Sequence, residues 1–175
     1  MSSYNEGKDI VVQWIRKNFP AGSSCLDVGA CDGKWSGLLG GYLIIDAVEI
    51  YEPNIVEHRL HDKYRSVICG DIADYYYNWY DLIIFGDVIE HMSVDKAQRV
   101  LKYAGQHCHD MIVSVPFLYK QTAIYGNRWE EHIQDDLTEE LFFERYGKWE
   151  KIVQPKKDYC YFHQSPHSEM ESVGQ

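Results

Sequence analysis

The sequence predicts an α/β domain built on a doubly wound, seven-stranded, mostly parallel sheet that ends in an antiparallel C-terminal hairpin strand. Two observations carry this prediction. Short, nearly continuous apolar runs alternate with segments of helical periodicity, which is typical of parallel strands covered on both faces by crossover helices. The last two strand-like runs instead flank the short polar turn at residues 155–158, which is typical of a hairpin.

The N-terminal half begins with a helical pattern. Apolar side chains recur at helical spacing between Ile10 and Ile15, and Pro20 and Gly22 end the pattern, so we expect an amphipathic helix packed across the sheet. A glycine-rich turn then joins a first strand to a short helix, and a second strand, a helix and a third strand follow. The expected ranges, in order, are residues 25–28, 34–39, 43–50, 53–61 and 66–69.

The C-terminal half continues the alternation. Strands are expected at residues 81–85 and 111–115, on either side of a helix that Ser93 caps. A further helix is expected to begin after Thr138 and to end at Gly147. The hairpin strands follow at residues 149–153 and 159–163.

One connection is unusually long. The stretch after Pro116, to about Asp136, carries many aromatic and charged side chains and is long for a plain connection, so it is a candidate substrate lid. Tyr119, Tyr125 and Trp129 are its candidate contacts. We expect residues 1–164 to form one domain and residues 165–175 to form a disordered polar tail, because the tail has few apolar side chains.

Composition narrows the function classes. A net charge of −10 disfavours bulk nucleic-acid binding, which needs clustered Lys and Arg. The five cysteines show no CxxC spacing and stand mostly in or beside apolar runs, so we expect buried, reduced thiols. No apolar run has the length of a leader core or a membrane span, which predicts a cytoplasmic protein without a membrane partner.

The turn after the first strand is a candidate cofactor site. Gly29 and Gly33 allow close approach of a ligand at the carboxyl end of a strand, where doubly wound sheets bind their ligands. Asp27 directly precedes this turn, and a carboxylate there is unfavourable beside a dinucleotide pyrophosphate. S-adenosylmethionine carries a sulfonium and an ammonium but no phosphate, so the same carboxylate favours that cofactor.

Two further strand ends fit the rest of such a cofactor. Glu49 ends the second strand and can accept hydrogen bonds from both ribose hydroxyls. Asp71 follows the third strand and can accept from the exocyclic amine of adenine, while Ile72 can cover the ring.

Together these segments resemble a known family. The segments 27–33, 48–49, 70–71 and 85–91 resemble, in order and spacing, the successive motifs of class I S-adenosylmethionine-dependent methyltransferases, which have a Rossmann-like fold. The resemblance covers roughly residues 10–164 and implies that Ala30 and Gly86 also contact the cofactor. In one departure, Cys31 stands where the family's turn has its middle glycine.

A second cluster follows the fourth strand. The segment from Asp87 to Met92 resembles the Glu-x-x-Glu-His segment of ubiquinone-type O-methyltransferases, the closest in wording, and of small-RNA terminal 2′-O-methyltransferases. In those relatives it can hold a divalent metal, and the RNA enzymes add a histidine after the fifth strand, for which His132 is the candidate. Glu90, His91 and His132 are therefore the candidate catalytic residues. A metal, a metal-free role in positioning substrate and a general-base role for His91 remain open.

The expected function is methyl transfer from S-adenosylmethionine to an oxygen or nitrogen of a small-molecule acceptor. Two alternatives stay open. One is a nicotinamide-dependent oxidoreductase on the same type of sheet, and the other is a methyltransferase-like binding or scaffold domain without efficient catalysis. The acceptor, the metal dependence and the oligomeric state do not follow from the sequence.

Overall fold

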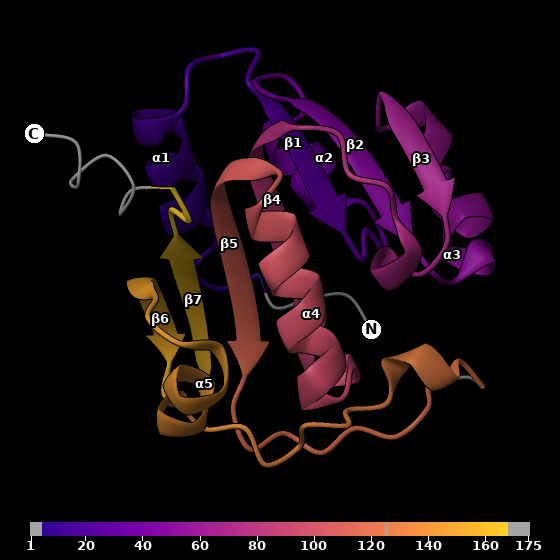
Figure 1. The fold of residues 1–175 in the computed structure, drawn as a ribbon. Coiled ribbons are helices and arrows are strands. Elements are labelled where there is room, and N and C mark those ends of the chain that lie inside the picture. The colour runs from indigo at the N-terminus through magenta and orange to yellow at the C-terminus, as the bar shows by residue number, and fades with distance from the viewer. Residues whose placement is uncertain (1–4, 125, 168–175) are drawn as a thin grey trace, which may run out of the picture.

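The computed structural model describes residues 5–124 and 126–167 and contains one seven-stranded sheet of order β3-β2-β1-β4-β5-β7-β6 (Figure 1). The strands are β1 (Ser24–Val28), β2 (Ile44–Glu49), β3 (Ser66–Cys69), β4 (Tyr80–Gly86), β5 (Cys108–Pro116), β6 (Glu150–Lys156) and β7 (Tyr159–Gln164). The α-helices are α1 (Lys8–Asn18), α2 (Lys34–Leu39), α3 (Glu52–Glu57), α4 (Val94–Gly105) and α5 (Glu139–Tyr146).

Strand directions match the predicted fold class. Strands β1 to β5 run parallel to one another, whereas β7 runs antiparallel to both β5 and β6. The register pairs Val28 of β1 with Val48 of β2 and with Phe85 of β4. The residues that follow, Gly29 and Gly86 among them, therefore lie side by side at the carboxyl edge of the sheet.

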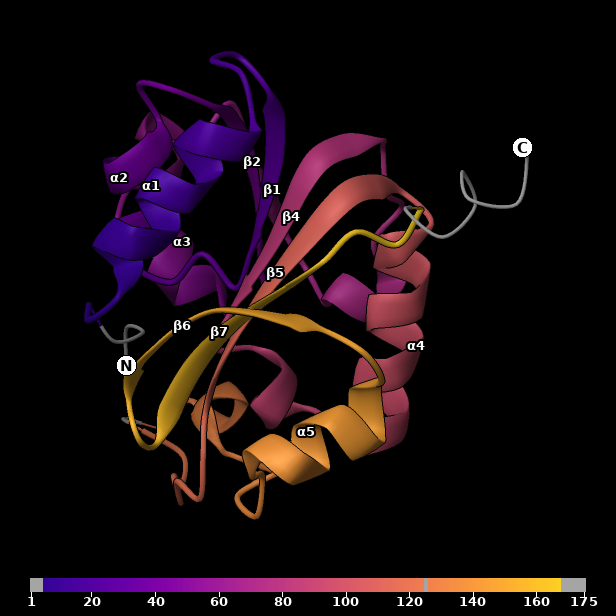
Figure 2. The ribbon, with the colours of Figure 1, turned by 90° about the vertical axis from the view of Figure 1, so that its left-hand side faces the viewer.

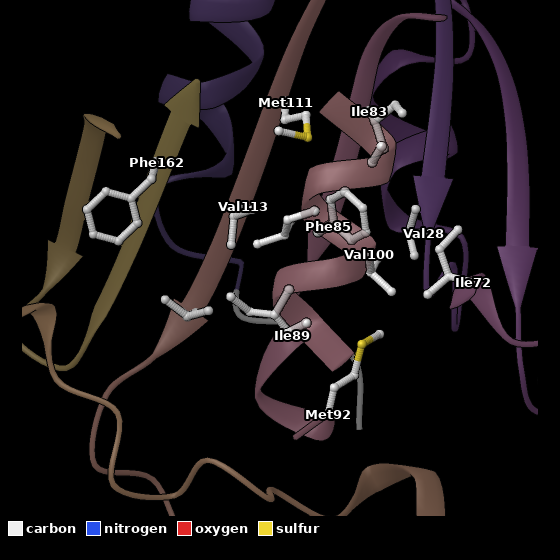
Figure 3. Packing of buried hydrophobic residues seen from close by; sticks show 14 of the residues in the cluster. Val28, Ile72, Ile83, Phe85, Ile89, Met92, Val100, Met111, Val113 and Phe162 are labelled. Carbon is white, nitrogen blue, oxygen red and sulfur yellow. The ribbon is translucent and has the colours of Figure 1, made fainter. Parts of the chain in front are cut away.

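Two apolar layers cover the sheet. Helices α1, α2 and α3 lie on one face, and α4 and α5 lie on the other (Figure 2). On the α4 face, Phe85 packs with Val100 and Val113 in one cluster (Figure 3). On the α1 face, Ile15 belongs to a second cluster, as the amphipathic pattern predicts. The central strands β1, β4 and β5 are therefore mostly buried on both sides, which explains their nearly continuous apolar sequences.

The predicted helix ends are confirmed. The Ser93 hydroxyl accepts a hydrogen bond from the Lys96 N–H at 3.4 Å, and the Thr138 hydroxyl accepts one from Leu141 at 3.2 Å. Gly147 follows α5 with φ of 79°, a conformation that favours glycine.

Two sequence predictions need correction. The single helix expected at residues 53–61 is interrupted, because Arg59 adopts a left-handed φ of 51° and separates α3 from a short 3-10 turn at Leu60–Asp62. The cysteines are free, as expected, but Cys69 is exposed because β3 lies at the edge of the sheet.

Within residues 5–124 and 126–167, no helix is long and apolar enough to cross a membrane. The expected disordered tail falls mainly on residues 168–175, which lie outside the described residues, as does Tyr125.

Candidate active site

A cavity lies at the carboxyl edge of the sheet and encloses about 1240 Å³, part of which is open to solvent. Its walls come from the ends of β1, β2 and β4 and from the long connection after β5. The predicted site residues that line it are Gly29, Ala30, Glu49, Asp71, Ile72, Gly86, Glu90, His91 and His132. Asp27 and Gly33 do not line it. Among the lid candidates, Tyr119 and Trp129 do.

Gly29 is required by its surroundings. Its φ is 72°, and a Cβ at this position would lie 2.7 Å from Cγ2 of Val88. Gly33 also has a left-handed φ, of 80°, but its neighbours are Leu60 and Lys63, outside the cavity wall. Gly29 thus shapes the cavity, whereas Gly33 shapes the turn that starts α2.

Cys31 occupies the place of the family's middle glycine and adopts a left-handed φ of 47°. Non-glycine residues rarely take this conformation, so the turn keeps a glycine-like backbone despite the substitution. The Cys31 N–H donates a hydrogen bond of 2.8 Å to Oε2 of Glu49. Burial raises the pKa of the Cys31 thiol to about 12, so the side chain stays neutral.

Glu49 is held rigidly at the end of β2. Its Oε2 accepts from Cys31, its Oε1 accepts from the Tyr51 N–H at 2.8 Å, and only 4% of the residue is exposed. Burial raises the pKa of the carboxyl, and the two backbone hydrogen bonds oppose that shift. A side-chain hydrogen bond from Asn54 also opposes the shift. A carboxylate has about four lone-pair sites, so these three donors leave one site that can accept from a ligand hydroxyl in the cavity.

Asp71 and Ile72 line the cavity after β3. Oδ1 of Asp71 accepts from the Ala73 N–H at 2.9 Å, and Oδ2 pairs with Nζ of Lys96 at 2.5 Å. Ile72 is buried with its side chain against the apolar cluster below the cavity (Figure 3). The ion pair with Lys96 was not predicted, because a lysine on the polar face of an amphipathic helix is normally expected to be solvated.

Asp27 lies beneath the cavity rather than in its wall. The residue is 1% exposed, and its Oδ2 accepts a hydrogen bond of 2.5 Å from the Tyr64 hydroxyl. Burial raises the pKa of this carboxyl to about 7, although the Tyr64 hydrogen bond opposes the shift. Direct contact of Asp27 with a ligand in the cavity is therefore not a feature of this structure.

Glu90, His91 and His132 meet at the other end of the cavity. Glu90 and His91 belong to a 3-10 turn, Ile89–His91, after β4, whereas His132 lies in the long connection after β5. Because β4 and β5 are neighbours in the sheet, both connections leave the same edge. The three side chains each offer one ligand atom, and these atoms all lie within 4.8 Å of one another.

Backbone carbonyls orient both imidazoles. Nδ1 of His91 lies 3.0 Å from the Glu131 carbonyl oxygen, and Nδ1 of His132 lies 2.8 Å from that of Tyr119. A carbonyl only accepts, so Nδ1 donates in both rings and each Nε2 keeps its lone pair. Burial lowers the pKa of His91 to about 4 and also lowers that of His132, so both rings are neutral at pH 7.

Glu90 is fully buried, and neither carboxyl oxygen has a hydrogen-bond partner within the described part of the chain. Burial and the nearby Asp87 raise the pKa of Glu90 well above its ordinary value. A buried carboxyl of this kind is stable when it is protonated or when a cation compensates it. One carboxylate and two neutral imidazoles with free Nε2 atoms fit a divalent cation such as Mn²⁺.

Trp35 was not among the predicted site residues. The residue lines the cavity from α2, although it is only 4% exposed. Its position just after the glycine turn could have indicated a place in the site. An aromatic residue in a helix is more often part of the hydrophobic core, however.

No protein-family model matches the sequence, and no curated protein matches it. Solved structures do. A S-adenosylmethionine-dependent methyltransferase from Clostridium acetobutylicum superposes with a TM-score of 0.68 at 13% identity, over 91% of this chain and 90% of that one. The N-terminal domain of EvdMO1 with bound S-adenosylhomocysteine gives 0.67 at 13% identity, over 92% and 80%.

A third structure is magnesium protoporphyrin IX methyltransferase from Synechocystis with bound S-adenosylmethionine, with a TM-score of 0.63 at 16% identity, over 89% of this chain and 76% of that one. The chain therefore has the class I methyltransferase fold, with a mostly parallel sheet and antiparallel C-terminal strands. The finer resemblance to ubiquinone-type enzymes has no counterpart among these three structures.

Proposed function

We propose that this protein is a S-adenosylmethionine-dependent methyltransferase that acts on an oxygen or nitrogen of a small molecule. One observation carries the proposal. A single cavity joins Gly29, Glu49 and Ile72, which suit a nucleoside, to Glu90, His91 and His132, which suit an acceptor. The fold shared with enzymes that bind S-adenosylmethionine or S-adenosylhomocysteine supports this assignment.

In the proposed arrangement, the nucleoside half of the cofactor lies along the ends of β1, β2 and β3. Glu49 accepts a hydrogen bond from a ribose hydroxyl, and its two backbone partners fix the carboxylate in place before the ligand arrives. Ile72 covers one face of the adenine, and Asp71 lies close enough to the cavity to accept from its amine.

The methyl group then points toward the end of the cavity that holds Glu90, His91 and His132. Methyl transfer is an in-line displacement, so the protein mainly has to align the acceptor atom with the sulfonium. A pKa near 4 makes His91 a weak proton acceptor at pH 7. Its neutral Nε2 is better suited to accept a hydrogen bond from the acceptor or to ligate a cation.

A divalent cation is an additional component that the residues would accept. Glu90, His91 and His132 would hold it, and the cation would lower the pKa of an acceptor hydroxyl. Without a cation, the same three groups orient the acceptor by hydrogen bonds. The two cases differ in whether the protein binds Mn²⁺.

The alternatives are less well supported by the site. A dinucleotide pyrophosphate would lie near the buried carboxyl of Glu49 and the side chain of Asp32, and the negative charge of both groups disfavours phosphate. The scaffold alternative predicts a degraded cofactor turn, yet Cys31 keeps the left-handed backbone and its N–H bonds Glu49.

Native mass spectrometry of the purified protein tests the proposal. We expect a mass increment equal to S-adenosylmethionine or S-adenosylhomocysteine, either co-purified or after incubation with the cofactor. A protein that retains neither ligand but retains a nicotinamide dinucleotide would overturn the proposed function.

A further inference from the structure

The indole of Trp35 carries a hydrogen-bond donor without a partner at the wall of the cavity. Trp35 lines the cavity, and its Nε1 is buried without a hydrogen-bond partner among residues 5–124 and 126–167. A buried tryptophan N–H normally has a partner, because burying an unsatisfied donor is unfavourable. The missing partner is therefore expected to be a ligand.

The position of this N–H is defined by Gly86. A Cβ placed on Gly86 would lie 2.9 Å from Nε1 of Trp35, so the donor packs against Gly86 at the end of β4. Gly86 also lines the cavity. In the sheet, β1 lies between β4, which ends at Gly86, and β2, which ends at Glu49, the residue assigned to the nucleoside.

Two lysines lie near the Trp35 indole. Nζ of Lys8, which is 3% exposed, lies 4.7 Å from the centroid of the Trp35 ring, and Lys34 lines the cavity beside it. Burial lowers the pKa of Lys8 to about 8, so its ammonium remains mostly charged at pH 7. An N–H donor with two ammonium groups nearby favours an anionic group with acceptor oxygens, such as a carboxylate.

A ligand group that contains both a carboxylate and an ammonium fits the charges in this part of the cavity. Asp87 lines this part of the cavity, and Oδ1 of its buried carboxyl accepts from Ser114 at 2.8 Å and from Tyr159 at 2.5 Å. Asp87 and Asp27 both act electrostatically on Lys8, so the region pairs negative with positive groups. An α-amino-acid group, with one charge of each sign, matches this pairing better than a simple anion does.

We propose that Trp35 donates its indole N–H to the α-carboxylate of the amino-acid half of the cofactor, and that Lys8 supports this contact through its charge. The inference rests on the proposed function, because it assumes a cofactor with an amino-acid group. It makes Trp35 a specificity-determining residue that distinguishes S-adenosylhomocysteine from nucleosides without that group.

Two ligands that differ only in the amino-acid half test the inference. Calorimetry measures the dissociation constants of S-adenosylhomocysteine and of 5′-deoxy-5′-methylthioadenosine for the wild type, for Trp35→Phe and for the control Trp79→Phe. Trp79 is half exposed and does not line the cavity. We expect Trp35→Phe to weaken the binding of S-adenosylhomocysteine about 10-fold and that of the truncated ligand less than about 2-fold. Trp79→Phe is expected to change neither affinity.

The outcomes separate the two proposals. Equal weakening of both ligands by Trp35→Phe, or no weakening, overturns the Trp35 inference and leaves the proposed function standing. Failure of both ligands to bind the wild type overturns the proposed function instead.

A measurement on the wild type covers the case in which Trp35→Phe does not fold. The indole N–H resonance of Trp35 in a ¹H–¹⁵N spectrum is expected to move on addition of S-adenosylhomocysteine and to move much less with the truncated ligand. The same displacement with both ligands would overturn the inference.

Discussion

The imidazole rings of His91 and His132 lie with their centroids 4.7 Å apart, although the two residues follow different strands of the sheet. Each ring directs Nδ1 to a backbone carbonyl, so both Nε2 atoms keep a lone pair, and one ring nitrogen of each lies within 4.8 Å of a carboxyl oxygen of the buried Glu90. This pair defines the acceptor end of the cavity and leads to the first prediction.

Wild-type protein is expected to bind one Mn²⁺ per chain if the Glu90, His91 and His132 group acts as a metal site. Glu90→Gln keeps the shape of the side chain but removes its charge, and we expect it to weaken Mn²⁺ binding at least about 10-fold. Calorimetric titration with MnCl₂ measures this, with His61→Ala at an exposed position as the control. Unchanged Mn²⁺ affinity in Glu90→Gln would place any bound metal elsewhere.

His91→Ala is expected to lower turnover while leaving S-adenosylhomocysteine affinity nearly unchanged, because His91 lies at the acceptor end of the cavity. The turnover assay needs an identified acceptor, whereas calorimetry measures the affinity without one. A large loss of S-adenosylhomocysteine affinity in a folded His91→Ala variant would contradict the placement of the acceptor at this end.

Glu49→Ala is expected to weaken the binding of S-adenosylhomocysteine by roughly 1–3 kcal/mol, since it removes a charge-assisted hydrogen bond to the ribose. The same change frees the Cys31 and Tyr51 N–H groups, so part of the loss reflects the turn. Glu49→Gln separates the two effects, because its amide oxygen can still accept one of the two backbone bonds. An unchanged affinity in folded Glu49→Ala would remove Glu49 from the cofactor site.

Gly29→Ala is expected to weaken S-adenosylhomocysteine about 10-fold and to lower the melting temperature. The new Cβ would lie 2.7 Å from Val88, and a left-handed φ costs a non-glycine residue about 1–2 kcal/mol. Gly37→Ala is the matched control, because Gly37 lies in α2 with nothing within 4 Å of its Cβ position. The control should leave affinity unchanged and slightly raise the melting temperature. Similar behaviour of the two variants would contradict the role given to Gly29.

Asp27→Asn is expected to change how stability depends on pH. Burial raises the Asp27 pKa to about 7 in the folded protein from about 4 in the unfolded chain, so the native state holds the proton more tightly. The favourable contribution of this group is therefore complete below about pH 4 and is lost as the pH rises toward 7.

The variant lacks that dependence. Its free energy of unfolding, relative to the wild type, should rise by roughly 2–4 kcal/mol between pH 4 and pH 7 and level off above that. Urea denaturation across this range measures the difference, with the exposed Asp158→Asn as the control. A difference that does not vary with pH would show that Asp27 titrates normally in the fold.

Periodicity made the fold predictable, because nearly continuous apolar strands separated by helical stripes admit few topologies other than a parallel sheet. Register then carried several site residues to one edge, which is why Glu49 and Gly86 could be placed from sequence. The prediction was less successful where a side chain's direction decides its role. Asp27 adjoins the glycine turn but points into the core, toward Tyr64.

Other features depend on tertiary contacts, which cannot be predicted from the residue type alone. Nothing about arginine predicts the left-handed conformation of Arg59 that ends α3 early. The local sequence pattern predicts a core position for Trp35. The proposed ligand contact follows only from the folded protein, in which its Nε1 has no hydrogen-bond partner among the described residues.

Calorimetric titration of the wild-type protein with S-adenosylhomocysteine and, separately, with NAD tests the central claim most directly. The proposed site predicts one S-adenosylhomocysteine per chain with a micromolar dissociation constant and no comparable binding of NAD. The reason is that Glu49 holds a carboxylate ready for a ribose, while a pyrophosphate would meet carboxylates at the turn. Tighter binding of NAD than of S-adenosylhomocysteine would contradict the methyltransferase assignment.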